Sequence, residues 1–157
     1  MTTAASERLD TDRDRSAADE YVLERQVGHL LRRAHQRHAA LFQERIGSAA
    51  LTPMQWAALF SLVRHGPTTQ NRLGRLTAMD PATIQGVVRR LVARGLVVRS
   101  ADPSDRRTRL LAATQAGHAL VTATLPIARE ISDATLAPLD EAERALFLKL
   151  LTRMAFA

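Results

Sequence analysis

The sequence contains no cysteine. This excludes disulfide bonds, thiolate metal ligands and peroxide sensing by a thiol, and it fits a reducing compartment. Long hydrophobic runs are also missing, because the longest unbroken apolar stretch covers only residues 56–60. A membrane-spanning helix needs about 20 such residues, and the N-terminus has no apolar segment typical of a secretory signal. We therefore expect a cytoplasmic protein without a membrane partner.

Signatures of catalysis are absent as well. We find no nucleophile elbow, phosphate-binding loop, zinc-protease signature or pair of carboxylates in a cleft-like setting. Ser61, Ser100 and Ser104 stand in no recognisable triad motif. We therefore expect neither an enzyme nor a cofactor.

Positive charge is concentrated in one part of the chain. The net charge is +6, and residues 64–109 hold ten arginines against three acidic residues, so the remainder of the chain is nearly neutral. Such clustering indicates a polyanionic partner, whereas the alternative interpretation is a solvated charged face.

The hydrophobic pattern predicts helices along most of the chain. Residues 1–18 are polar without periodicity and predict a disordered tail, followed by a single domain over residues 19–157. Caps and breakers such as Thr52-Pro53, Asp80-Pro81 and Gly95 delimit the helices. The helices are expected at residues 23–46, 53–65, 68–79, 80–94, 114–136 and 139–155, with a possible kink at Pro126.

Between two of these helices the periodicity changes from helical to extended. Residues 96–100 and 108–114 are typical of strands, and the turn-forming, arginine-rich segment 101–107 joins them in a hairpin. A short helix, a turn, a second helix and a basic hairpin predict a mainly α winged helix-turn-helix. The second helix can enter the major groove of DNA, and the wing can place arginine in the minor groove.

The helix after Asp80 divides into two faces. Its inner side carries Ile84, Val87, Val88, Leu91 and Val92, whereas Ala82, Thr83, Gln85, Gly86 and Arg89 point outward. Gln85 can pair with adenine and Arg89 can reach guanine or phosphate. Glycine destabilises a helix interior by about 1 kcal/mol relative to alanine. A close approach of the helix backbone to DNA would explain why residue 86 is glycine, and close packing against another helix is the alternative.

Three stretches resemble the MarR family of bacterial transcription regulators: "LTPMQWAAL" (51–59), "QNRLGRLTAMDPATIQGVVRRLVARGLVVR" (70–99) and "DPSDRRTRLLAATQAG" (102–117). The resemblance implies a homodimer that binds double-stranded DNA at a pseudo-palindromic operator, usually as a repressor. It also implies that Arg107 enters the minor groove, that Arg106 contacts phosphate, and that an Arg90–Asp105 ion pair supports the wing. The predicted DNA-contacting residues are Gln70, Asn71, Arg72, Pro81, Ala82, Thr83, Gln85, Gly86, Arg89, Arg106 and Arg107.

The terminal helices carry more apolar surface than a small winged domain can bury. We therefore predict dimerisation through residues 19–47 and 114–157, with a DNA-binding lobe over residues 51–113. Two-fold symmetry would place the two recognition helices roughly 34 Å apart. A self-contained six-helix monomer is the alternative.

The first helix places His35 and His38 on the same stripe as Leu31 and Phe42. The two histidines could pack in an interface, help to bind a small anion, or bind a metal with further ligands from elsewhere in the chain. No further spacing supports the metal. The candidate effector residues are Arg33, His35, His38, Phe42, Trp56 and Phe60.

The resemblance favours an aromatic carboxylate as effector. The stretches "QVGHLLRRAHQRHAALF", "TPMQWAAL" and "QNRLGRLTAMD" are similar to the subgroup that controls nicotinate breakdown and responds to a hydroxylated nicotinate. An architectural DNA-binding protein without an effector and a zinc-responsive regulator are the alternatives.

Overall fold

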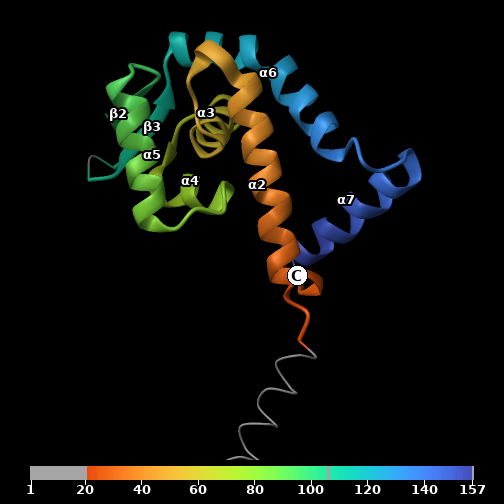
Figure 1. Ribbon diagram of the computed structural model, residues 1–157. Helices are drawn as coiled ribbons and strands as arrows, with labels where there is room; N and C mark the ends of the chain where they lie inside the picture. The colour runs from red at the N-terminus through yellow and green to blue at the C-terminus, as the bar shows by residue number, and fades with distance from the viewer. Residues whose placement is uncertain (1–20, 106, 157) are drawn as a thin grey trace, which may run out of the picture. The chain divides into compact units, whose positions relative to one another are not determined.

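The computed structural model describes residues 21–105 and 107–156, and these residues form helices and one small antiparallel sheet (Figure 1). The predicted tail, residues 1–18, lies outside the described residues. The described residues fall into two compact units, one within residues 1–37 and one within residues 38–157. The elements are η1 (Leu23–Arg25), α2 (Val27–Ile46), η2 (Gly47–Ala49), α3 (Pro53–His65), β1 (Thr68–Thr69), α4 (Gln70–Leu76), α5 (Pro81–Ala93), β2 (Val97–Ala101), β3 (Arg109–Ala113), α6 (Gln115–Leu136) and α7 (Glu141–Ala155).

Helices α3, α5, α6 and α7 begin at the capping residues that the sequence indicated, whereas the first helix, predicted from residue 23, begins only at Val27 because η1 precedes it. At the start of α3, the Thr52 hydroxyl accepts a hydrogen bond from the Gln55 N–H at 3.2 Å, and the Gln55 side-chain oxygen accepts one from the Thr52 N–H at 3.0 Å. The same reciprocal arrangement joins Asp140 and Glu143 at the start of α7. Each box satisfies backbone donors that a helix start otherwise leaves unpaired.

The predicted hairpin is confirmed, but the sheet has one strand more than expected. Strand β3 pairs with β2 on one side, with Val97 opposite Ala113, and with β1 on the other, with Thr68 opposite Leu111. The sequence analysis placed Thr68 and Thr69 in the short helix. Only Thr69 belongs to its start, as N-cap, and the helix itself begins at Gln70.

The core of the second unit lies between the helices and the sheet. Helix α3 packs against α5, α6 and β3, and α5 also packs against α4 and β2. The largest fully buried side chains of this region include Leu59 and Leu62 of α3 and Leu91 of α5. This shared core fixes the position of α5 relative to the hairpin of β2 and β3.

At one point the backbone of α6 comes unusually close to the segment between α5 and β2. A Cβ atom at Gly117 would lie 2.3 Å from the carbonyl oxygen of Leu96 and 3.2 Å from Leu59 Cδ1. The Leu96 carbonyl also accepts a hydrogen bond from the Thr114 N–H at 3.0 Å. Only glycine fits at this junction.

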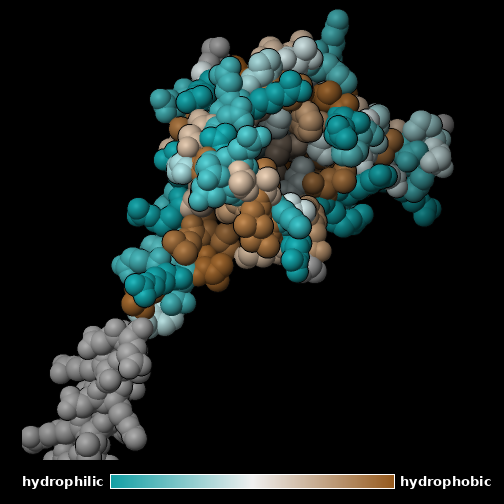
Figure 2. Space-filling model, turned by 90° about the vertical axis from the view of Figure 1, so that its right-hand side faces the viewer, coloured by the Kyte–Doolittle hydropathy of each residue, from teal (hydrophilic) through white to brown (hydrophobic). Residues whose placement is uncertain are grey.

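Helix α7 buries none of its residues. Its apolar side chains Leu146, Phe147, Leu148, Leu150 and Met154 are between 40% and 57% exposed. In the first unit the α2 side chains Val27, Leu30 and Leu31 are also exposed. Figure 2 shows hydrophobic residues gathered on the surface of the face that it presents. No helix within the described residues is long and apolar enough to cross a membrane.

Candidate nucleic-acid interface

Helix α5 begins with a strong cap. One carboxylate oxygen of Asp80 accepts hydrogen bonds from the N–H groups of Ala82 and Thr83 at 3.0 and 2.9 Å, and the other accepts from the Thr83 hydroxyl at 2.5 Å. The bonds from the Thr83 hydroxyl and N–H lower the pKa of Asp80, because they stabilise the ionised carboxylate. The first turn of this helix is therefore rigidly held at neutral pH.

The two faces of α5 are divided as predicted. Ile84, Val87, Val88 and Leu91 are buried, whereas Ala82, Gln85, Arg89 and Arg90 are exposed and Thr83 and Gly86 are half-buried. The outward face combines an amide and two guanidinium groups with two very small residues. Such a surface can approach base edges closely and offer them hydrogen-bond donors.

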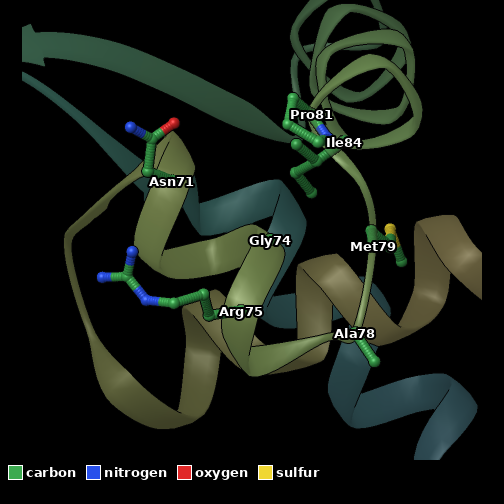
Figure 3. Close-up of a pocket in the computed structure, with 7 residues that line it drawn as sticks. All are labelled: Asn71, Gly74, Arg75, Ala78, Met79, Pro81 and Ile84. Carbon is green, nitrogen blue, oxygen red and sulfur yellow. The ribbon is translucent and has the colours of Figure 1, made fainter.

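A hollow lies where α4, the connecting turn and α5 meet. It measures about 370 Å³ and is lined by Asn71, Gly74, Arg75, Ala78, Met79, Pro81 and Ile84. Figure 3 shows the side chains of Asn71 and Arg75 pointing to the same side of α4. Of the other α4 residues predicted to contact DNA, Gln70 is half-buried and Arg72 is exposed.

Arg75 was not among the predicted contacts. Arg75 lies four residues after Asn71, and residues i and i+4 share a helix face. This spacing could have identified Arg75 as a contact from the sequence. The turn beside it is tight, since a Cβ atom at Gly74 would lie 3.1 Å from the Met79 carbonyl oxygen. The structure therefore adds a cationic side chain next to a predicted contact.

The wing between β2 and β3 is organised by two aspartates. Asp102 Oδ1 accepts hydrogen bonds from the N–H and the hydroxyl of Ser104 at 2.8 and 2.6 Å, and the hydroxyl bond is the main cause of the lowered pKa of Asp102. Asp105 accepts from the Arg107 N–H and the Thr108 hydroxyl, each at 2.9 Å. These bonds hold a compact turn on which the Arg107 side chain is exposed. Arg106 lies outside the described residues.

The expected ion pair between Arg90 and Asp105 is not formed among the residues that the structure describes. The two carboxylate oxygens of Asp105 each bond within the turn. The Nη2 atom of Arg90 instead lies 3.6 Å from the position that a Cβ atom of residue 86 would take. Asp105 thus supports the wing through local hydrogen bonds, and its pairing with Arg90 stays a prediction.

Another arginine of this region has a structural role. The Arg94 guanidinium donates two hydrogen bonds of 2.8 Å, one to the Ala49 carbonyl and one to the Ala50 carbonyl. Arg94 follows α5 directly, so these bonds tie the end of the recognition helix to the segment after α2. At least one arginine of the basic segment 64–109 is therefore used for contacts within the protein.

Four candidate effector residues lie in the second unit, and two of them contact α6. Trp56 Nε1 donates to Thr124 Oγ1 at 2.9 Å and stacks on Phe60, with ring centroids 5.0 Å apart and an interplanar angle of 10°. His38 Nδ1 lies 3.0 Å from Thr135 Oγ1, and its ring centroid is 6.4 Å from that of Phe42.

The Thr135 hydroxyl has two neighbours. It donates a hydrogen bond to the Ile131 carbonyl at 2.8 Å and shares a second one with His38 Nδ1, whose donor depends on the tautomer of the imidazole.

Within the second unit, the candidate effector residues contact α6 at two separate places. Thr124 and Thr135 are eleven residues apart, which is about 16 Å along a helix, so the Trp56 and His38 contacts lie at separate levels of α6. Arg33 and His35 are exposed and belong to the first unit. Within the described residues no three His, Asp or Glu side chains gather as metal ligands.

Comparison with known proteins identifies the family. The model of the MarR family matches residues 51–108. The HTH-type transcriptional repressor NicR of Pseudomonas putida is 46% identical over 134 residues, which cover 85% of each chain.

Two solved structures are similar over almost their whole length. A probable transcriptional regulator from Pseudomonas aeruginosa is 53% identical with a TM-score of 0.82, over 85% of this chain and 99% of that one. Bordetella bronchiseptica BpsR, whose DNA binding is regulated by 6-hydroxynicotinic acid, is 43% identical with a TM-score of 0.83, over 87% and 98%. The chain therefore belongs to the MarR family of winged helix-turn-helix transcriptional regulators.

Proposed function

We propose that the protein is a transcriptional repressor that binds a pseudo-palindromic operator as a homodimer and releases it when a small aromatic carboxylate binds. The observation that carries the DNA-binding role is the pairing of an outward polar face on α5 with the compact wing that exposes Arg107. The repressor role is supported by the 46% identity to NicR over most of both chains. This function needs no catalytic group and places the protein in the cytoplasm.

The DNA contacts follow from this arrangement. Gln85 and Arg89 on α5 would contact base edges in the major groove, and Arg107 would enter the adjacent minor groove. Asn71 and Arg75 flank the hollow next to α5 and would contact the phosphate backbone. Phosphate contacts position the helix, whereas base contacts select the sequence.

The dimer is supported by the apolar side chains that each unit leaves exposed. Helix α7 presents Leu146, Phe147, Leu150 and Met154 to solvent, an arrangement that costs free energy in a monomer. We assign dimerisation to residues 19–47 and 114–157 and DNA binding to residues 51–113. Covering the apolar helices with a second copy removes this surface from water.

The effector is expected to act at α6. Trp56 donates a hydrogen bond to a hydroxyl on this helix and His38 shares one with another, and the stacked Trp56 and Phe60 rings offer an aromatic surface. The regulation of BpsR by 6-hydroxynicotinic acid makes hydroxylated nicotinates the first candidates. Arg33 and His35 remain candidates for the carboxylate.

The first test is a footprint on the DNA upstream of the protein's own gene, followed by fluorescence anisotropy with that site and with a scrambled duplex. We expect a footprint with two-fold symmetry, a stoichiometry of two chains for each site, and weaker binding to the scrambled duplex. Equal affinity for both duplexes would instead indicate an architectural DNA-binding protein. A saturating ratio of one chain for each site would contradict the dimer.

A further inference from the structure

The end of helix α5 is bonded to the junction between α2 and α3. Arg94 is the C-cap residue of α5, and its guanidinium donates from Nη1 to the Ala50 carbonyl and from Nη2 to the Ala49 carbonyl, each at 2.8 Å. A planar guanidinium that bonds two consecutive carbonyls through two nitrogens fixes their direction as well as their distance. The partners are 44 and 45 residues apart in the sequence, so the bonds join separate elements of the fold.

The junction itself has a strained backbone. Gly47 and Ala50 both have positive φ angles, of 56° and 47°. Alanine rarely adopts this left-handed conformation, because its Cβ atom then crowds the following carbonyl oxygen. Such a conformation persists only where the surrounding contacts hold it. At Ala50 these contacts include a hydrogen bond from its own N–H to the Gly47 carbonyl at 3.1 Å and the bond that its carbonyl accepts from Arg94.

The two residues after Arg94 are bonded to the start of α6. The Gly95 carbonyl accepts a hydrogen bond from the Thr114 hydroxyl at 2.8 Å, and the Leu96 carbonyl accepts one from the Thr114 N–H at 3.0 Å. Thr114 is the N-cap of α6. Residues 94–96 therefore connect the end of α5 both to the α2–α3 junction and to α6.

We infer that Arg94 is a positioning residue that couples the α2–α3 junction to the recognition helix α5, so that an effector bound at α2 and α3 changes the DNA affinity through this guanidinium. This inference rests on the proposed function. The two candidate effector residues that contact α6 come from the helices that the junction joins, since His38 lies on α2 and Trp56 on α3.

The bonds from Arg94 provide a direct route for this coupling. A change in the angle between α2 and α3 moves the carbonyls of Ala49 and Ala50, and the guanidinium carries the movement to the end of α5. Coupling between two sites is reciprocal, so DNA bound to α5 also restrains the junction.

The first experiment measures the affinity of full-length variants for the footprinted operator by anisotropy, with and without an excess of 6-hydroxynicotinate. Arg94→Met removes the donors and keeps an unbranched stem, whereas Arg94→Lys keeps the charge without the planar fork. Arg129→Met, which replaces an exposed arginine of α6, is the matched control. We expect the acid to weaken binding roughly 5- to 150-fold in the wild type and the control. This factor should fall close to one in Arg94→Met and take an intermediate value in Arg94→Lys.

The second experiment needs no effector. Hydrogen exchange in a peptide that covers residues 42–52 is compared between the free protein and its complex with DNA. We expect DNA binding to slow this exchange in the wild type and to leave it unchanged in Arg94→Met.

A double variant separates stability from coupling. Glycine adopts the backbone conformation of residue 50 at little cost, so adding Ala50→Gly to Arg94→Met should raise the melting temperature again. The effector factor and the exchange of residues 42–52 should stay as in Arg94→Met. If Arg94→Met does not fold, Arg94→Lys decides both experiments.

Each outcome supports or overturns the inference. A folded Arg94→Met that keeps the effector factor and the slowed exchange would overturn it and leave the proposed function intact. An affinity loss with an unchanged effector factor, restored by Arg94→Lys and accompanied by a salt dependence shallower by about 0.9 in log–log slope, would assign Arg94 to a phosphate and also overturn it. A wild type that the acid does not release would contradict the effector part of the proposed function. The exchange comparison then decides the coupling alone, because it needs only bound DNA.

Discussion

Replacing Gly117 with alanine puts a methyl group where the fold has no room. The new Cβ would lie 2.3 Å from the Leu96 carbonyl oxygen, well inside contact distance, and 3.2 Å from Leu59 Cδ1. The Leu96 carbonyl cannot move freely, because it also accepts the hydrogen bond from the Thr114 N–H. Overpacking of this kind costs about 1–3 kcal/mol, and the higher helix propensity of alanine returns at most about 1 kcal/mol.

We expect a net loss of about 2 kcal/mol, which lowers the melting temperature of a chain of this length by roughly 4–8 °C. The assay is thermal unfolding followed by circular dichroism, at one protein concentration because dimerisation stabilises the fold. Gly86→Ala is the matched control, since its methyl group would meet only the flexible Arg90 side chain at 3.6 Å. An unchanged melting temperature for Gly117→Ala would refute the close approach of α6 to Leu96.

Four further outcomes are expected. Arg107→Ala should weaken operator binding strongly in anisotropy titrations while the dimer stays folded, and Arg129→Ala, which replaces an exposed arginine of α6, should change little. Gln85→Ala should cost about 1–3 kcal/mol on the operator and little on random DNA; equal losses would make Gln85 a positioning residue. Leu150→Glu should shift the sedimentation profile toward monomer, because it places charge in the proposed interface; an unchanged dimer would contradict that interface. Asp80 has a lowered pKa, so it stabilises the folded state above the ordinary Asp value near 3.9 and loses this contribution as the pH falls through its folded pKa. Between about pH 5 and 2 the free energy of unfolding should therefore fall more for the wild type than for Asp80→Asn. Equal decreases in the two proteins would argue against the capping role of Asp80.

Local signals in the sequence predicted most of the fold. Thr52, Asp80 and Asp140 each cap a helix where expected, since a capping side chain bonds to backbone only two or three residues away. The inner and outer faces of α5 were also predicted, because helical periodicity relates neighbouring residues alone.

Features that depend on distant parts of the chain were missed. Strand β1 has only two residues and exists because Thr68 and Thr69 pair with β3, about forty residues later. No local sequence pattern predicts such pairing.

The candidate effector residues show the same limit. Helical periodicity predicted that His38 and Phe42 share one face of α2, and their ring centroids do lie 6.4 Å apart. The threonines of α6 that form hydrogen bonds with His38 and Trp56 could not be predicted, because they come from a helix almost 70 to 100 residues away in the chain.

Control of DNA binding by a small aromatic acid can be tested by a mobility-shift titration on the footprinted operator. The protein is held at a concentration that half-saturates the operator, and nicotinate, 6-hydroxynicotinate, salicylate, 4-hydroxybenzoate and zinc chloride are added separately. We expect release by one of the aromatic acids, with 6-hydroxynicotinate first, and no release by zinc. Release by zinc alone, or unchanged binding with every acid, would contradict it.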